Sequence, residues 1–480
     1  MYIGVDAGTS MTKAAAFDDH GRVLRVVAER TQLLNPRDGW YEQDSDEVVA
    51  SVTDVVRRLV VDIGEPPALI ALTGQGDGVW PVDGDGRPTR PAISWMDARA
   101  ADVLREWIDA GVADSAFRRT GNVFFPGCPA PVLAWLDRNE PEVLDRTATA
   151  AYCKDVVMQR FTGVRATDPS DASLPFLDPH TRVYADDVLE ACGLTHRAAL
   201  LAPVVEPCPR GALLPEVAAQ LGVPAGIPVT AGPFDLPASA LGAGVTAPGD
   251  GNLIVGTTLA CQVVIDELDT SGEPAGLTLA YGPRGRWIRA MPAMVGTAAL
   301  DWVLATIGEK HVRVNEFLDA SPPGARGVTC LPYFSPAGER APFVEPGARA
   351  RYDGLTLQTD KADLVRAVCE AIAYAARHCF DAAGLRGGVA VCGGGIKSAR
   401  WLQLFADVLG RPVRVAPKEE IGAYGAVLAG LAAIGSPVDA TEWAEDEVVV
   451  EPDQTRTSFY AEGFEHYRTA VELARKGWKS

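Results

Sequence analysis

The chain begins with MYIGVDAGTS (residues 1–10), the stretch that decides the fold. Residues 2–5 are apolar and predict a strand, and the small residues after them predict a tight turn. Two further strands are predicted at residues 13–17 and 23–29, with a polar turn between them. The chain is therefore predicted to open with a three-stranded meander.

Helices and strands are mixed along the rest of the first half. Apolar residues at helical spacing predict a helix at 45–63, and a short buried strand is predicted at 69–73. Further helices are predicted at 98–110, 130–139 and 212–221. Strands mixed with helices favour an α/β architecture.

The second half starts in a similar way to the first. An apolar strand at 251–255 leads into the turn Gly256-Thr257-Thr258, and a strand resumes at 259–264. Later predicted elements are a helix at 361–384, a strand at 389–391, and helices at 398–409 and 422–434. Two copies of one unit are a plausible interpretation. Residues 242–249 are rich in Gly and suit a hinge, which predicts domains at 1–244 and 245–480.

Composition sets limits on the class of protein. A chain of 480 residues is longer than one ordinary hydrophobic core can accommodate. A composition of 47% hydrophobic and 22% charged residues is typical of globular proteins. The formal net charge of -19 argues against nucleic acid and anionic membrane as partners. It does not argue against a nucleotide, because backbone amides and a metal ion can bind phosphate inside an acidic protein.

Cysteine and histidine usage indicates neither disulfides nor a transition-metal site. The nine cysteines form no CxxC pair, and the six histidines show no metal-ligand spacing. Reduced thiols and a start without a signal peptide predict a cytoplasmic protein. The apolar run 423–435 is too short to span a bilayer and is interpreted as a buried helix.

Three glycine turns are candidate phosphate or nucleotide contacts. Backbone N–H groups in the turn 6–10 can face an anion, and Asp6 can hold Mg²⁺ through water. The alternative is a plain hairpin turn. Gly256-Thr257-Thr258 offers a second such turn, and Gly393-Gly394-Gly395 can let a flat ring approach the backbone or can simply connect a strand to a helix. There is no GxxxxGK[ST] sequence, which excludes a P-loop enzyme.

Acidic residues near glycine turns are candidates for substrate chemistry. Asp235, after Gly232-Pro233-Phe234, suits either a catalytic base or the N-cap of the following helix. The segment 74–78 (GQGDG) and the segment 94–99 (SWMDAR) offer amide, carboxylate and aromatic groups that suit a polyol. Asp97 is also expected to cap the helix from Ala98.

In this order the motifs resemble the FGGY family of carbohydrate kinases over essentially the whole chain. The landmarks are segments 4–10, 40–44, 73–76, 95–99, 154–155, 232–235, 256–258, 338–342 and 393–395. Each motif is modest, but their joint occurrence in order is specific. The resemblance implies a two-lobed actin/hexokinase-like (ribonuclease H-like) fold with a duplicated core, in which ATP and substrate bind in the central cleft.

The resemblance also implies roles for individual residues. Asp235 would be the catalytic base, and Asp6 with Asp235 would lie at Mg²⁺. The implied polyol-binding residues are Gln75, Gly76, Asp77, Trp95, Asp97, Phe234 and Asp235. The implied ATP-binding residues are Thr9, Ser10, Lys13, Gly256, Thr257, Thr258, Gly296, Gly393 and Gly394. The N-terminal domain would bind the polyol and the C-terminal domain ATP, and a homodimer is a possible assembly.

Substrate choice turns on residues 76 and 77. Xylulose kinases usually carry Met and His in this pocket segment, whereas this chain has Gly76 and Asp77. Glycine is expected to open volume and aspartate to accept a further hydroxyl, so the segment looks more like that of erythritol kinases. A four- or five-carbon polyol is predicted, with xylulose or another ketopentose as the alternative.

A different class of function stays open at this point. The same fold hosts chaperones and filament proteins that bind ATP without phosphorylating a small molecule, and a degenerate kinase can serve as a sugar sensor. Asp77 and Asp97, together with Asp235, argue against the chaperones and filament proteins. Asp6 and Asp235 argue against a degenerate kinase.

Overall fold

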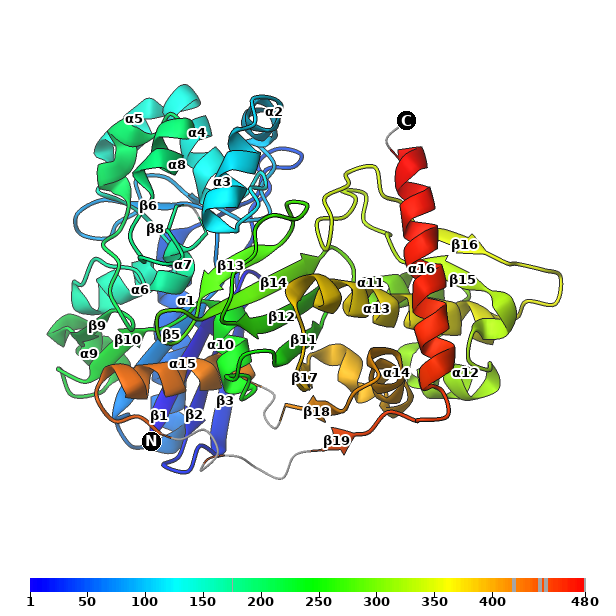
Figure 1. The fold of residues 1–480 in the computed structure, drawn as a ribbon. Helices are drawn as coiled ribbons and strands as arrows, with labels where there is room; N and C mark the ends of the chain where they lie inside the picture. Colours follow the sequence, from blue (N-terminus) through cyan, green and yellow to red (C-terminus); the bar gives the residue numbers. More distant parts are fainter. Residues whose placement is uncertain (175, 417–419, 439–442, 444–447, 479–480) are drawn as a thin grey trace.

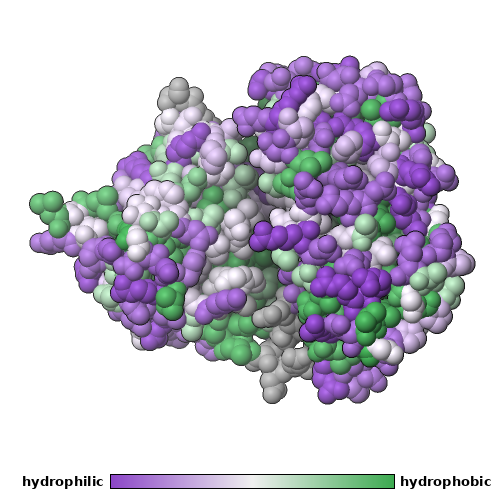
Figure 2. All heavy atoms as spheres, turned by 180° about the vertical axis from the view of Figure 1, so that it is seen from behind, coloured by the Kyte–Doolittle hydropathy of each residue, from purple (hydrophilic) through white to green (hydrophobic). Residues whose placement is uncertain are grey.

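A computed structural model describes residues 1–174, 176–416, 420–438, 443 and 448–478. Figure 1 shows two halves that each contain a central sheet, the first in blue to green and the second in green to red. Seen from behind, a furrow separates the two masses of the molecule (Figure 2). The predicted α/β class and two-lobed architecture are confirmed.

The first sheet is built around the opening meander. Strand β1 pairs antiparallel with β2 and parallel with β5, and β5 pairs parallel with β10. Its strand order is β3 (Val23–Arg30), β2 (Met11–Phe17), β1 (Tyr2–Ala7), β5 (Leu69–Gly74), β10 (Pro228–Ala231) and β9 (Arg210–Ala212). The predicted meander is thus confirmed.

The second sheet repeats this connectivity. Strand β11 pairs antiparallel with β12 and parallel with β17, and β17 pairs parallel with β18. Its strand order is β13 (Leu277–Ala280), β14 (Trp287–Ala293), β12 (Leu259–Ile265), β11 (Gly251–Val255), β17 (Val389–Cys392), β18 (Val413–Val415) and β19 (Val449–Val450). In both sheets an antiparallel three-stranded unit is extended by parallel strands beside its first strand, which confirms the duplicated core.

The long helices carry clear end signals. Helix α1 (Ser45–Ile63) is capped by Asp44, whose side chain accepts from the N–H groups of residues 46 and 47, and it ends at the left-handed Gly64. Helix α13 (Lys361–Ala383) starts with a capping box on Asp360 and ends at Gly384. These helices match their predicted positions because periodicity and caps agree.

Further helices pack on the two sheets or on one another. They are α2 (Ala101–Asp109), α3 (Val112–Thr120), α4 (Pro129–Asn139), α5 (Pro141–Arg146), α6 (Cys153–Thr162), α7 (Pro169–Ala172), α8 (Asp186–Ala191), α9 (Pro215–Leu221), α11 (Thr297–Thr306), α12 (Val314–Ala320), α14 (Ala399–Leu409) and α16 (Thr457–Trp478), with short 3₁₀ turns at Thr195–Leu200, His311–Arg313, Ala325–Gly327 and Gly394–Lys397. Short strand pairs are β4 (Glu42–Gln43) with β7 (Ala92–Ile93), β6 (Trp80–Val82) with β8 (Thr149–Ala151), and β15 (Thr329–Leu331) with β16 (Arg351–Asp353).

Two predicted helix starts are wrong. The helix expected from Ala212 begins at Pro215, because residues 210–212 form β9 on the edge of the first sheet. The helix expected from Ala98 begins at Ala101, and its N-cap residue Ala100 makes no side-chain capping bond.

Two helices cross between the halves. Helix α10 (Asp235–Gly242) packs against α15 (Ile421–Ala433), and α15 in turn covers strands β1 and β5 of the first sheet. A Cβ atom on Gly425 would lie 1.9 Å from the Ala238 carbonyl oxygen, so the crossing requires glycine there. Within the described residues no helix is long and apolar enough to cross a membrane.

Candidate functional site

Three acidic residues follow or end three adjacent parallel strands of the first sheet. Asp6 lies near the end of β1, Asp77 follows β5, and Asp235 follows β10. The carboxyl ends of neighbouring parallel strands lie at one edge of a sheet, where ligands of α/β proteins bind. The topology therefore gathers three carboxylates that are widely separated in the sequence.

Asp235 is the first residue of α10 and is not its cap. The N-cap is Phe234, and no side-chain capping bond is formed, so the N-cap interpretation of Asp235 is wrong. Burial raises the pKa of Asp235 to about 8, and the charges of Asp6 and Asp77 add to the rise, while a hydrogen bond from the Leu236 N–H opposes it. A buried carboxylate with a raised pKa is a stronger proton acceptor than an exposed one.

Asp6 is half-buried and lies beside an ion pair. Burial raises its pKa to about 6, with Lys13 lowering it and Glu420 raising it, and Lys13 Nζ lies 3.2 Å from Glu420 Oε2. The Asp6 Oδ1 atom has no hydrogen-bond partner among the described residues. Mg²⁺ commonly takes one or two carboxylates and completes its shell with water and phosphate oxygens, so Asp6 with Asp235 fits that ion.

Asp77 is held in a strained conformation. Its φ of 59° lies in the left-handed region that a residue with a Cβ rarely adopts. The residue is 8% exposed, and its Oδ1 atom has no hydrogen-bond partner among the described residues. Burial raises the pKa of Asp77 to about 7, against the opposing charge of Arg340.

A hydrogen-bond network joins the opening turn to the predicted polyol pocket. The Trp95 indole donates to Thr9 Oγ1 at 2.9 Å, and that hydroxyl donates to Gln75 Oε1 at 2.9 Å. Gln75 donates onward to Gln43 Oε1 at 2.8 Å. Thr9, Gln75 and Trp95 are therefore brought together, and Gln43 joins them as a residue for which no role was predicted.

Gly76 does not open the pocket as expected. A Cβ atom at this position would lie 2.5 Å from Cδ2 of Phe234, so the aromatic ring fills the space. Glycine is needed because Phe234, next to Asp235, packs directly on the backbone. The space that a side chain at residue 76 would occupy is thus filled by the ring of Phe234, which is itself a predicted pocket residue.

Asp97 is fully engaged within the N-terminal half. Arg99 donates to its Oδ1 and Oδ2 atoms at 2.9 Å, and the Tyr41 N–H donates to Oδ2 at 2.7 Å. It does not cap a helix, because α2 starts four residues later. Arg99 also lies over the Trp40 ring at 4.0 Å, so Asp97 fixes an arginine within an aromatic cluster.

The glycine turns of the second half follow strands β11 and β17, which occupy the same positions in the second sheet as β1 and β5 do in the first. Gly256 follows β11, and the turn is held by Gly296, whose N–H donates to the Thr257 carbonyl at 2.8 Å. A Cβ atom on Gly296 would lie 2.5 Å from the Gly256 carbonyl oxygen. Gly296 is also the N-cap residue of α11, so a helix N-terminus adjoins the turn, as at many phosphate sites. Thr257 and Thr258 are exposed.

The triple-glycine turn lies beside this one. Gly393 follows β17 with a φ of 97°, and a Cβ atom there would lie 2.6 Å from the Val255 carbonyl oxygen. An added Cβ atom on Gly394 would meet nothing within 4 Å. Gly393 is thus required by packing, whereas Gly394 faces open space. Ser10, at the first turn, is likewise exposed.

Arg340 is the residue that sequence reasoning missed. Its run, 338–342, is a family landmark, but a landmark carries no role by itself. Its guanidinium lies 5.6 Å from the Trp95 ring centroid and 5.7 Å from that of Phe125, although both rings belong to the first half. An isolated arginine in a loop gives no local signal that it will meet residues more than 200 positions earlier.

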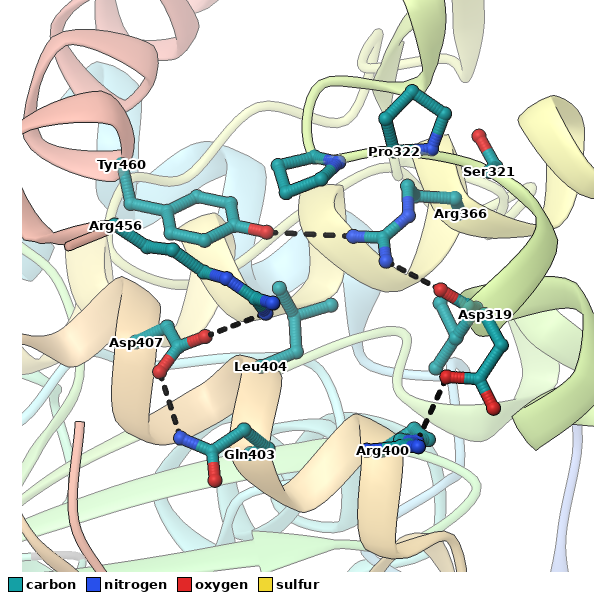
Figure 3. Close-up of a pocket in the computed structure, with 12 residues that line it drawn as sticks. Asp319, Ser321, Pro322, Arg366, Arg400, Gln403, Leu404, Asp407, Arg456 and Tyr460 are labelled. Carbon is teal, nitrogen blue, oxygen red and sulfur yellow. Dashed lines mark hydrogen bonds and ion pairs between the residues drawn. The ribbon is translucent and has the colours of Figure 1, made fainter. Parts of the chain in front are cut away.

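A separate pocket of about 180 Å³ lies on the second half, outside the carboxylate cluster. Figure 3 shows it between helices, lined by polar and charged side chains that contact one another, such as the ion pair of Arg400 with Asp319 at 2.8 Å and the hydrogen bond from Gln403 to Asp407 at 2.8 Å. None of the predicted site residues lines it. Within the described residues there is no group of three or more His, Cys, Asp or Glu placed to hold a metal ion.

Comparison with known proteins gives relatives over nearly the full chain. An erythritol kinase of Brucella abortus (strain 2308) is 34% identical over 497 residues, covering 98% of this chain and 95% of the relative. A xylulose kinase of Escherichia coli (strain K12) is 32% identical over 446 residues, covering 90% of each.

Solved structures share the fold. A ligand-bound xylulose kinase from Lactobacillus acidophilus superposes with a TM-score of 0.91 at 23% identity, covering 98% of both chains. The xylulose kinase from Rhodospirillum rubrum superposes with a TM-score of 0.87 at 27% identity, covering 100% of this chain and 99% of the other.

Family models match both halves. The N-terminal domain model of the FGGY family of carbohydrate kinases matches residues 1–242, and the C-terminal domain model matches residues 251–434. Together they leave unmatched mainly the interdomain segment and the last 46 residues. The chain therefore belongs to the FGGY family of carbohydrate kinases.

Proposed function

We propose that this kinase transfers the γ-phosphoryl group of ATP to a hydroxyl of a small open-chain polyol, with erythritol as the first candidate. The observation that carries the proposal is the cluster of Asp6, Asp77 and Asp235 at adjacent strand ends, three carboxyl groups whose pKa values are all raised by the loss of solvent around them. Asp77, where xylulose kinases usually carry histidine, favours a ligand rich in hydroxyl donors.

Each residue of the cluster has a distinct task in this proposal. Asp235 accepts the proton of the attacked hydroxyl, and its raised pKa suits a general base. Asp6 with Asp235 would hold Mg²⁺, which supplies charge neutralisation on the phosphate oxygens. Phe234 and Trp95 provide apolar walls, and Asp77 accepts from a substrate hydroxyl.

The nucleotide would lie against the glycine turns. Thr9, Ser10 and Lys13 from residues 1–244 and the turn 256–258 with Gly296 from residues 245–480 face the phosphate chain. Gly393 and Gly394 lie against the adenosine. The exposed hydroxyls of Thr257 and Thr258 and the N-terminus of α11 support phosphate binding there.

A second candidate is the phosphorylation of xylulose or another ketopentose. It is favoured by the names of relatives, since a xylulose kinase is 32% identical over 90% of the chain. Gly76 and Asp77 weigh against it, because the pocket wall differs from the usual Met and His.

A substrate panel tests the proposal. The purified protein with Mg²⁺ and ATP is assayed for ADP release with erythritol, ribitol, xylitol and D-xylulose, each against a reaction without acceptor. We expect the highest kcat/KM for erythritol or a near alditol. A higher kcat/KM for D-xylulose than for every alditol would establish the second candidate, and ADP release independent of any acceptor would contradict both.

A further inference from the structure

Arg340 reaches from the second half of the chain into the wall of the polyol pocket. It lies in the segment between β15 and β16, yet its guanidinium stacks over the rings of Trp95 and Phe125, 5.6 Å and 5.7 Å from their centroids. A guanidinium within about 6 Å of an aromatic face is attracted to it. Two aromatic side chains of the first half of the chain therefore make cation–π contacts with one arginine of the second half.

The loop that carries Arg340 is tightly built. Glu339 Oε1 accepts from the N–H groups of Met294 at 2.9 Å and Arg340 at 2.8 Å. Arg340 Nε donates to the Pro292 carbonyl oxygen at 2.8 Å, which fixes the plane of the guanidinium. Its two terminal nitrogens have no hydrogen-bond partner among the described residues, so they remain free to donate to a ligand.

Asp77 lies beside the residue whose ring Arg340 covers, since an added Cβ atom on the next residue, Gly78, would lie 3.1 Å from the backbone nitrogen of Trp95. The charge of Arg340 acts on Asp77, but no hydrogen bond or ion pair within 4.0 Å joins them among the described residues. The Asp77 Oδ1 atom is buried without a partner, in a residue that is 8% exposed. An unpartnered buried carboxylate is costly unless a ligand supplies a donor.

A group that satisfies both residues must donate on one side and accept on the other. An alcohol hydroxyl does both, whereas a keto oxygen accepts without donating and an ammonium group donates without accepting. The pair is thus complementary to a hydroxyl-bearing carbon, and the two halves of the chain contribute one partner each.

We propose that Arg340 is a specificity-determining residue and that one non-reacting hydroxyl of the polyol bridges Asp77 and Arg340, donating to the carboxylate and accepting from the guanidinium. This inference rests on the proposed polyol kinase function. Recognition of that hydroxyl then depends on both lobes, because Asp77 supplies only an acceptor for the hydroxyl and Arg340 supplies only a donor. A substrate without this hydroxyl leaves both charges unpaired.

The test compares variants on matched substrates. Arg340→Met, Arg340→Lys, Asp77→Asn and the double variant Arg340→Met with Asp77→Asn are assayed with erythritol and with the butanetriols that each lack one of its hydroxyls. The exposed Arg351→Met serves as a matched control, since Arg351 is paired with Asp353 on β16. KM for ATP is measured in every protein.

We expect Arg340→Met to lower kcat/KM for erythritol by about 10–100-fold, the range for leaving a charged hydrogen-bonding group unpaired. For the butanetriol that lacks the bridging hydroxyl the same substitution has little effect, and the double variant loses less than the sum of the single losses. Arg340→Lys retains a donor and recovers part of the activity. KM for ATP stays unchanged.

The inference would be overturned if Arg340→Met lowered kcat/KM by the same factor for erythritol and for every butanetriol. It would also be overturned if the losses of kcat/KM in the two single variants were additive in the double variant. So would unchanged kcat/KM in both Arg340 variants. These outcomes differ from failure of the proposed function, in which the wild-type protein itself phosphorylates no polyol. Calorimetric titration of erythritol into wild-type and Arg340→Met protein without ATP gives an independent readout, and equal affinities would also contradict the bridge.

Discussion

At the scale of single residues, the proposed site depends on carboxylates that are largely withdrawn from water. Asp77 is buried and Asp6 and Asp235 are half-buried, and each has a raised pKa because the loss of solvent disfavours its charged form. Close negative charges cannot all ionise without a compensating cation. A bound cation and the Arg340 guanidinium are therefore the natural complements of this cluster, and the residues present fit both.

Gly394 provides a residue-scale test of the nucleotide site. An added side chain there meets open space, so Gly394→Val leaves the fold intact and intrudes on the proposed adenosine site. We expect at least about a tenfold rise in Kd for ATP, the result of losing about 1.4 kcal/mol of contact. Titration calorimetry measures it.

The matched control is Gly388→Val. Gly388 lies at the other end of β17, and an added Cβ atom there also meets nothing within 4 Å. It should bind ATP as the wild type does. Equal affinity of Gly394→Val and wild type would remove residue 394 from the nucleotide site.

At the scale of elements, a buried cluster fixes the turn that carries Asp235. Lys154 on α6 has no exposed side-chain surface, and its Nζ lies 2.7 Å from Asp155 and 2.9 Å from both Asp168 and Asp171. These acids belong to α6 and to the start of α7. Ser170, also in α7, accepts a hydrogen bond from the Phe234 N–H at 3.1 Å, so the cluster supports the residue before Asp235.

Removing the cation tests this cluster. Lys154→Met leaves three buried carboxylates uncompensated and should lower the free energy of unfolding by about 3–5 kcal/mol at pH 7. The loss should shrink toward pH 5, because protonated carboxylates need no cation. Urea unfolding at both pH values measures it, and Lys361→Met, which removes an exposed pair with Glu309, is the control with a change below about 1 kcal/mol. A loss that grows on acidification would contradict the account.

The contact between α13 and α16 makes stability depend on pH. Burial lowers the pKa of His378 to about 4, with Arg468 and Arg475 contributing, and its ring packs near Phe464 and Tyr467. Between the unfolded pKa of about 6.5 and about 4, the unfolded chain binds a proton that the folded chain does not. The contribution of His378 to the free energy of unfolding is therefore fully present above pH 6.5 and decreases as the pH falls toward 4.

The variant His378→Gln isolates this effect. Between pH 6.5 and pH 4, this group alone should lower the free energy of unfolding of the wild type by up to about 3 kcal/mol. The decrease in His378→Gln should be smaller by the same amount. Thermal unfolding over this pH range compares the two slopes. Parallel slopes would show that His378 is not held neutral in the folded protein.

The same elements show what sequence can and cannot predict. The strands of the meander and helices α1 and α13 were predictable because periodicity, caps and glycine stops all act locally. The edge strand β9 was missed because three residues acquire strand structure only through pairing with β10. The filling of the space at Gly76 by Phe234 and the approach of Arg340 to Trp95 depend on tertiary contacts without a local signal.

At the scale of the whole molecule, two sheets repeat one connectivity, and the predicted site residues follow strands of both. The carboxylates follow the parallel strands of the first sheet, and the glycine turns follow those of the second. Helices α10 and α15 cross between the halves through close glycine contacts. Kinases must exclude water from the transferred phosphoryl group, and two lobes joined by few segments can do so by closing.

Closure is measurable in solution. Small-angle scattering with a non-hydrolysable ATP analogue and erythritol together should show a smaller radius of gyration than the free protein, because the lobes rotate toward each other about residues 242–249. Either ligand alone should give a smaller change than both. An identical profile with both ligands at saturation would argue against closure.

The central claim is that Asp235 takes the proton from a polyol hydroxyl while ATP donates the phosphoryl group. The most direct test is product formation from erythritol and ATP, followed by ³¹P NMR, in wild-type and Asp235→Asn protein. We predict a phosphate monoester with the wild type and a kcat lower by about 10²–10⁴ in the variant, with the affinity for ATP nearly unchanged. Near-wild-type turnover by correctly folded Asp235→Asn protein would contradict the account.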